Sequence, residues 1–247
     1  PIPRRQRQMC IRDRLKTINN AVSGQLTLTD YDVDLSGSTA DIKAALDGTF
    51  ADTYTGNVTL GDADDAEIAA ADISTIAGDT NGTVTVTNAI IITGTSAAIA
   101  TAVGNVDTFS NTPSVELDDP HTLAQLKAIN DAISGEIYLD DYDVDLSGSS
   151  SDVAAALAGT FASTYTGDVS LDDAHTLAQL KAINAATTGT ITLTDYSVDL
   201  TGSSSDVAAA LAGLFADTYT GNVTLGDAHN LTQLKAINAA TSGTITL

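Results

Sequence analysis

A period of about 54 residues places the strongest constraint on the fold of this chain. The phrase LDDPHTLAQLKAIN begins at Leu117, LDDAHTLAQLKAIN at Leu171 and LGDAHNLTQLKAIN at Leu225, so successive copies are equally spaced. LKTIN at Leu15 is an earlier copy, and a diverged copy begins at Ile73. Near-identical copies at a fixed spacing indicate a repeat array, in which each unit buries its apolar face against its neighbours.

The copies divide residues 15–247 into units of similar design. Their bounds are 15–72, 73–125, 126–179 and 180–233, followed by a partial unit at 234–247. Each full unit has two halves of about 27 residues. In each half an Ala-rich stretch is followed by a Gly and then by a short β-branched run that ends in Leu-x-Asp.

The Ala-rich stretches predict helices. Apolar residues recur there at helical spacing: Leu177, Leu180 and Ile183 in one half, and Val207, Leu211 and Leu214 in the other. Ser203 and Asp206 form a Ser-x-x-Asp sequence suited to cap a helix start, and it recurs from Ser38 and Ser149. Gly189 and Gly221 stand where a helix must end and a strand begin.

The β-branched runs predict half-buried strands, because apolar and polar residues alternate in them. Nine runs begin near Gln25, Asn57, Thr83, Ser114, Glu136, Asp168, Thr190, Asn222 and Thr244. A change of phase near Asp30 indicates a corner, followed by a second short strand in alternate coils. Strand–helix–strand order predicts parallel pairing.

These elements predict a linear α/β solenoid of helix–strand coils with a parallel β-sheet. Its core consists of stacked Leu, Ile, Val and Ala, with recurring larger fillers at Phe50, Phe161, Phe215, Tyr54, Tyr165 and Tyr219. The alternative is a parallel β-helix in which the Ala-rich segments are loops. The helix propensity of AAALAGLFA favours the α/β fold.

Residues 1–14 differ in composition from the rest. They hold five of the ten basic residues, together with the only Met and the only Cys, Met9 and Cys10. Residues 9–14, MCIRDR, resemble the translated end of a sequencing adapter. We therefore expect 1–14 to be a non-native, disordered tail. The last unit stops part-way through its pattern, so we also expect a metagenomic fragment of a longer repetitive protein.

The charge of the chain bears on its partners. The formal net charge is −22, and an acidic surface repels nucleic acid and anionic membranes. No apolar run approaches the roughly 20 residues of a membrane span. Residues 15–247 contain no cysteine, which leaves no disulfide scaffold there.

Carboxylates and histidines are the candidate ligand groups. The Asp columns, which would supply the oxygen ligands that calcium prefers, are Asp30, Asp32, Asp34, Asp141, Asp143 and Asp145. We expect a solvated face there, with calcium binding as the alternative. His121, His175 and His229 recur once in each period, two coils or about 10 Å apart, too far to share a metal. We expect them to be helix-start residues, and we predict no catalytic, cofactor-binding or metal-binding residue.

The LKAIN-AATTG-TITL and GSSSDVAAALAG phrases resemble the repetitive regions of very large secreted or cell-surface, adhesin-like proteins of aquatic bacteria. The resemblance covers residues 15–247. It implies an extracellular, non-enzymatic stalk or adhesive spacer, and the alternative function is a calcium- or ligand-binding solenoid module. Expected partners are neighbouring repeats or domains of the same chain, an unknown surface ligand, and further copies joined end to end.

Overall fold

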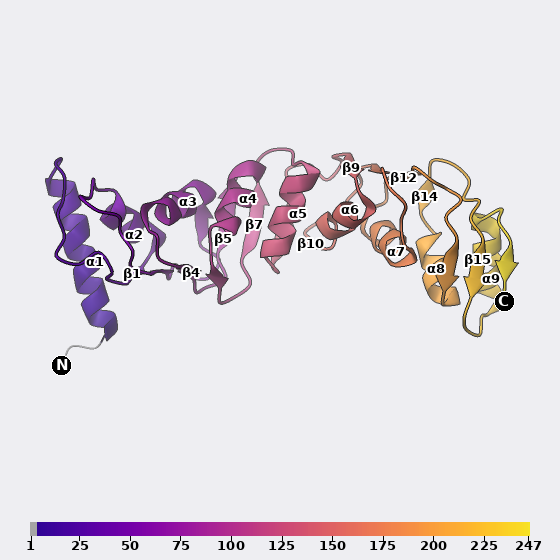
Figure 1. Cartoon of the computed structure of the whole chain (residues 1–247), viewed down its shortest axis with the longest axis horizontal. Coiled ribbons are helices and arrows are strands. Elements are labelled where there is room, and N and C mark those ends of the chain that lie inside the picture. The colour runs from indigo at the N-terminus through magenta and orange to yellow at the C-terminus, as the bar shows by residue number, and fades with distance from the viewer. Residues whose placement is uncertain (1–3) are drawn as a thin grey trace. The chain divides into compact units, whose positions relative to one another are not determined.

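Helices alternate with short parallel strands in the computed structural model, which describes residues 4–247 (Figure 1). The helices are α1 Arg4–Ala21, α2 Thr39–Leu46, α3 Ala70–Asp79, α4 Ser96–Gly104, α5 Leu123–Ala132, α6 Ser150–Ala156, α7 Leu177–Ala186, α8 Ser204–Ala210 and α9 Leu231–Ala240. The chain forms two compact units, described separately below: one reaches to Asp119 and adds Ala132–Tyr138, and the other comprises Pro120–Asp131 and Leu139–Leu247.

Unit 1 contains two parallel sheets. Its strands are β1 Leu35–Gly37, β2 Val58–Leu60, β3 Glu67–Ala69, β4 Val84–Val86, β5 Ile91–Gly94, β6 Thr108–Phe109, β7 Ser114–Leu117 and β8 Glu136–Tyr138. One sheet has the order β1-β2-β4-β6, and the other includes β3, β5, β7 and β8 as successive neighbours. Leu35 pairs with Val58 and Val58 with Val84, so buried apolar residues stack in a column. Successive helices from α1 to α4 pack on one another.

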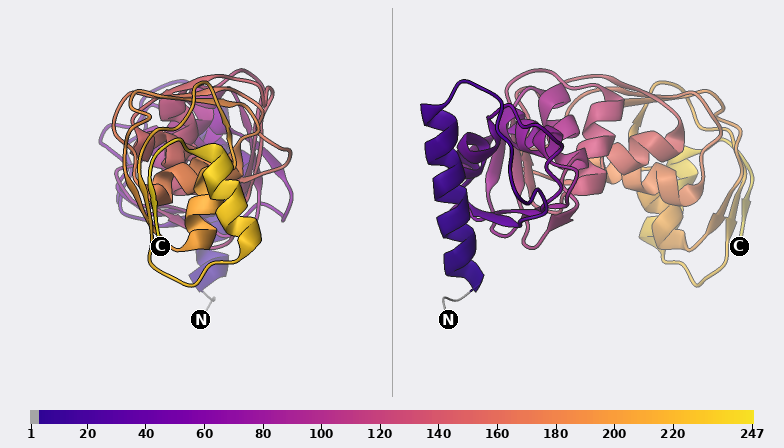
Figure 2. Two further views of the ribbon diagram at one scale, coloured as in Figure 1. Left: turned by 90° about the vertical axis from the view of Figure 1, so that its right-hand side faces the viewer. Right: turned by 60° about the vertical axis from the view of Figure 1, so that its left-hand side comes forward.

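Unit 2 repeats this design. Its strands are β9 Leu146–Gly148, β10 Thr160–Phe161, β11 Val169–Leu171, β12 Thr190–Leu193, β13 Leu200–Gly202, β14 Leu214–Phe215, β15 Val223–Leu225 and β16 Ile245–Thr246. The sheets have the orders β9-β11-β12-β14 and β13-β15-β16, all in parallel. Successive helices from α6 to α9 pack on one another, as Figure 2 shows.

The structure is thus α/β with parallel sheets, as predicted. Eight of the nine predicted runs contain strands, while the run near Gln25 contributes only a bridge between Leu26 and Phe50. The predicted second strand after the corner is present as β1, β9 and β13. The Ala-rich segments are helices α6 and α8, so the β-helix alternative, which makes them loops, is wrong.

Glycine is required where backbone segments that are 22 residues apart in the chain approach one another. A Cβ at Gly189 would lie 2.2 Å from the carbonyl oxygen of Gly167, and one at Gly243 would lie 2.2 Å from that of Gly221. These distances are far below any van der Waals contact, and the obstructing atom is backbone. The predicted position of Gly189 between helix and strand is right, and its reason is this close approach.

One predicted helical contact is wrong. Helix α8 ends at Ala210, and Leu214 lies beyond it in β14 with 63% of its surface exposed. The buried face of α8 consists of Ser204, Val207 and Ala210, with Leu211 just beyond. The side-chain amide of Asn184 donates to the carbonyl oxygen of Ala209, which occupies an acceptor at the end of α8 where the chain turns back toward the sheet.

Helix α1 crosses the predicted junction between tail and repeats without a break. It begins at Arg4 and includes the LKTIN copy from Leu15, so the described part of the predicted tail is helical, and residues 1–3 lie outside the described residues. Arg12 is buried and donates to the carbonyl oxygen of Ser36. A foreign origin for residues 1–14 stays a prediction.

Candidate functional site

The first aspartate of each predicted Asp column closes its own turn. Asp30 accepts a hydrogen bond from the backbone N–H of Asp32 at 3.0 Å, and Asp141 accepts one from that of Asp143 at 2.8 Å. This is the Asx turn, in which a short carboxylate replaces a backbone acceptor. In the third copy Asp195 accepts from both the N–H and the hydroxyl of Ser197, and these bonds hold the pKa of Asp195 below its usual value.

The last aspartate of each column binds a segment 23 residues further along the chain. Asp145 accepts from the backbone N–H of Asp168 at 3.0 Å, and Asp199 accepts from that of Asn222 at 2.8 Å. Asp34 makes the same contact with Asn57 at 3.2 Å. The columns therefore supply acceptors to backbone N–H groups that follow 23 residues later. Among the described residues no three His, Cys, Asp or Glu side chains are placed to hold one metal ion.

A second series of aspartates caps helices whose first residues lie 23 residues earlier in the chain. Asp173 accepts from the N–H of Ser150 at 2.7 Å, and Asp227 accepts from that of Ser204 at 2.7 Å. Ser150 and Ser204 are the first residues of α6 and α8, so each carboxylate lies at the positive end of a helix. The sequence analysis missed this role. The constant spacing of 23 residues between each Ser and its Asp was the available signal.

Serine caps complete the same helix starts, as predicted. Ser149 accepts from the backbone N–H of Asp152, and Ser203 accepts from that of Asp206. Lys181 of α7 binds Asp206 at 2.5 Å, and this contact lowers the pKa of the Asp206 carboxyl. These side chains stabilise helix ends and contacts between neighbouring helices.

Each of two histidines joins a buried tyrosine that follows it 44 residues later. His121 and His175 are 3% and 4% exposed, and their Nε2 atoms lie 3.0 Å from the hydroxyl oxygens of Tyr165 and Tyr219. Tyr219 donates its single hydroxyl proton to the carbonyl oxygen of Val198 at 2.6 Å. Nε2 of His175 must therefore be the donor to Tyr219.

Burial fixes the protonation of this pair. Desolvation lowers the pKa of His175, opposed by the charges of Asp195 and Asp173. Burial also raises the pKa of Tyr219 well above its ordinary value. At neutral pH both groups are uncharged, which suits a structural hydrogen bond. The histidines precede helices as expected, but their burial and tyrosine partners were not predicted.

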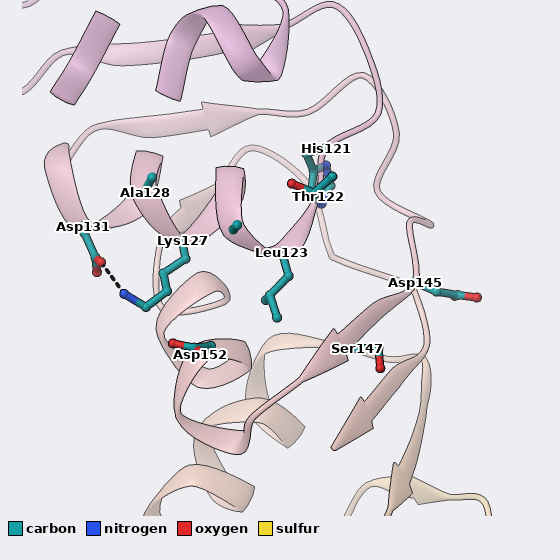
Figure 3. Close-up of a pocket in the computed structure, with 10 residues that line it drawn as sticks. His121, Thr122, Leu123, Lys127, Ala128, Asp131, Asp145, Ser147 and Asp152 are labelled. Carbon is teal, nitrogen blue, oxygen red and sulfur yellow. Dashed lines mark hydrogen bonds and ion pairs between the residues drawn. The ribbon is translucent and has the colours of Figure 1, made fainter. Parts of the chain in front are cut away.

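A pocket of about 790 Å³ lies between α5 and α6 (Figure 3). Leu123, Ala124 and Ala128 form its apolar wall, and carboxylates lie around it. It is lined by His121, Thr122, Leu123, Ala124, Lys127, Ala128, Asp131, Asp145, Ser147 and Asp152. The imidazole of His121 is bound to Tyr165, and Lys127 is bound to Asp131.

No protein-family model matches the chain, and a search of curated proteins finds no match. Within the described residues, none of the helices combines the length and the apolar character needed to cross a membrane.

Proposed function

We propose that this chain is a non-enzymatic structural segment, a stalk or adhesive spacer built as a linear α/β solenoid. The observation that carries the proposal is the recurrence of one buried contact. The set His121, Tyr165 and Val144 returns one repeat later as His175, Tyr219 and Val198, with the same His–Tyr distance of 3.0 Å. A contact that recurs with the repeat stabilises the repeated fold, whereas an active site usually occurs once in a protein.

The polar side chains support the same proposal. Recurring aspartates and histidines bind groups that are distant in the chain: Asp145 binds the N–H of Asp168, Asp173 that of Ser150, Asp227 that of Ser204, and His175 the hydroxyl of Tyr219. These side chains connect successive segments of the repeat, whereas the serine caps and the Asx turns act within their own segments. In a linear array the number of units sets the reach, and many identical surfaces give avidity when geometry allows them to bind together.

An extracellular or cell-surface location belongs to this proposal. Its support is the resemblance of residues 15–247 to repeats of giant secreted proteins, together with the net charge of −22. Such a charge keeps a long protein soluble and disfavours contact with nucleic acid. The proposed partners are adjoining repeats or domains of the same chain and a surface ligand whose chemistry the repeat does not specify.

Exposed apolar residues at α9 and β16 support end-to-end association of copies. Leu231 and Leu247 are 68% and 66% exposed, and they line a pocket of about 300 Å³ with Leu234 and Ile245. Static light scattering over a concentration series tests this. We expect the mass to rise with concentration, and a constant monomer mass at high concentration contradicts the association.

The spacer proposal is tested by excising one unit. A variant without residues 126–179 joins Gln125 to Leu180 and keeps the repeat phrase intact. The maximum dimension from small-angle X-ray scattering should fall by about 10 to 20 Å, two strand spacings or two helix spacings. An unchanged dimension in a folded variant contradicts a linear solenoid.

Calcium binding is the second candidate function, favoured by the exposed carboxylates of Asp30, Asp32 and Asp141. Melting the chain with and without millimolar calcium separates the two functions. A site that forms only in the folded chain raises the midpoint as calcium increases. The structural proposal predicts an unchanged midpoint, with magnesium at the same ionic strength as the control.

A further inference from the structure

A lysine of the repeat phrase normally joins its helix to the next one. Lys16 of α1 binds Asp41 of α2 at 2.5 Å, and Lys181 of α7 binds Asp206 of α8 at 2.5 Å. In both cases the aspartate follows the lysine by 25 residues. The corresponding pair in α5 and α6 is Lys127 and Asp152.

Lys127 makes a different contact. Its Nζ lies 2.8 Å from Asp131 of its own helix, one turn further along, as the dashed line in Figure 3 shows. Asp131 stands where α7 has Ala185, so α7 offers its lysine no such alternative. Asp152 keeps its contact with the cap residue Ser149 at 2.9 Å. The ion pair between the helices is thus replaced by one within α5.

The two helices are also separated at this place. Helices α7 and α8 pack closely, whereas α5 and α6 do not, and the pocket of about 790 Å³ lies between them. A hydrogen bond between them remains, in which Asn130 donates to the carbonyl oxygen of Ala155, and Leu123 of α5 lies close to Gly148 of β9. The same contacts occur around α7 and α8, where Asn184 donates to Ala209 and Leu177 lies close to Gly202 of β13. The position of the lysine is therefore a specific difference between the two pairs.

We propose that Asp131 draws Lys127 away from Asp152 and thereby makes the α5–α6 contact a preferred opening point of unit 2. This weak contact arises from a single difference between two otherwise identical helices, Asp131 in α5 where α7 has Ala185. It does not depend on the proposed function, because any role of the chain is compatible with a weak contact at this position. In the pair within α5 the lysine precedes the aspartate, which is the less favourable order relative to the helix dipole. When Asp131 is removed, Lys127 loses this partner and can return to Asp152.

Hydrogen exchange measured by mass spectrometry on the full chain tests the proposal. Helices α6 and α8 share the sequence SSDVAAA, so their unprotected amides exchange at closely similar rates. We expect amides of α6 to exchange about twofold to fivefold faster than those of α8, the factor that corresponds to one exposed ion pair.

Reciprocal substitutions supply matched variants. Asp131→Ala should slow exchange in α6 to the rate of α8, and Ala185→Asp should raise exchange in α8 to the rate of α6. Adding Asp152→Asn to Asp131→Ala should restore the fast exchange, because the returning lysine then lacks its carboxylate. Equal rates in the unmodified chain, or an α6 rate that Asp131→Ala leaves unchanged, overturn the proposal.

Discussion

His175 and Tyr219 lie 44 residues apart in the chain and share a buried hydrogen bond of 3.0 Å between Nε2 and the hydroxyl oxygen. The hydroxyl group of Tyr219 in turn donates a hydrogen bond to the carbonyl oxygen of Val198. One side chain thus connects three segments of unit 2. The same arrangement at His121, Tyr165 and Val144 makes this contact a property of the repeat.

Removal of the tyrosine hydroxyl should destabilise the fold. Tyr219→Phe leaves the Nε2 donor of His175 and the Val198 carbonyl without this partner in the core, at a cost of about 1 to 3 kcal/mol. Urea unfolding followed by circular dichroism measures the change. Tyr138→Phe, at an exposed tyrosine that binds Glu136, is the control and should change the free energy of unfolding by less than about 0.5 kcal/mol. Equal effects contradict the account.

Stability should fall below neutral pH because of His175. Burial lowers its pKa in the folded chain, while in the unfolded chain the pKa is about 6.5. As the pH falls below about 6.5, the unfolded chain binds a proton that the folded chain does not, so the free energy of unfolding decreases. His175→Gln retains an N–H donor and removes the titration. Its loss of stability between pH 7 and pH 5.5 should be smaller, and an equal loss contradicts the assignment.

Carboxylates act at lower pH and in a separate window. The pKa of Asp206 is lowered chiefly by Lys181, and that of Asp41 chiefly by Lys16. A carboxyl whose pKa is lower in the folded chain adds stability above its unfolded pKa near 4, and this stability is lost as the pH falls through the folded pKa. These two carboxylates therefore add little to the change in stability between pH 7 and pH 5.5, where the comparison with His175→Gln is made.

Substitution at Gly189 should be strongly destabilising. Gly189→Ala places a methyl group 2.2 Å from the carbonyl oxygen of Gly167, and relieving this contact requires backbone movement at a cost of about 1 to 3 kcal/mol or more. Gly78→Ala is the matched control, because Gly78 lies in α3 with open space around it. It should stabilise the chain by about 0.5 to 1 kcal/mol through helix propensity. Thermal melts of both variants measure these opposite changes in stability.

The helix cap supplied by Asp173 should contribute measurably. Asp173→Ala removes the carboxylate that accepts from Ser150 N–H at the start of α6, and loss of such a cap costs about 1 kcal/mol. The neighbouring exposed Asp172 gives the control variant Asp172→Ala, expected within about 0.5 kcal/mol of the parent. If the two variants unfold at the same urea concentration, the capping role is wrong.

Local patterns in the sequence were enough to predict the elements. Alternation around Ile191 predicted β12, and the Ser-x-x-Asp sequence at Ser203 predicted the start of α8. Both signals act over a few residues. Leu214 was predicted wrongly as a helical contact, because α8 already ends at Ala210, where Asn184 of α7 binds the carbonyl oxygen of Ala209. Contacts made across coils lie outside the reach of such patterns.

The contacts at the candidate site also divide into those that the sequence predicted and those that it did not. The repeat period drew attention to His175, but the period alone does not reveal which neighbour its ring faces. Tyr219 recurs with the same period and was predicted as a core filler, which it is. Their pairing depends on the path of the chain between them. The caps at Asp173 and Asp227 were not predicted, because they also depend on the path of the chain between the bonded residues.

The most direct test of the central claim, that equivalent coils are held by equivalent contacts, is Tyr219→Phe in the chain that lacks residues 126–179. This excision places His121 44 residues before Tyr219, the natural spacing of the pair. The account predicts that the shortened chain folds, and that Tyr219→Phe costs the same free energy of unfolding as in the full chain, within about 0.5 kcal/mol. A shortened chain that fails to fold, or one indifferent to Tyr219→Phe, contradicts it.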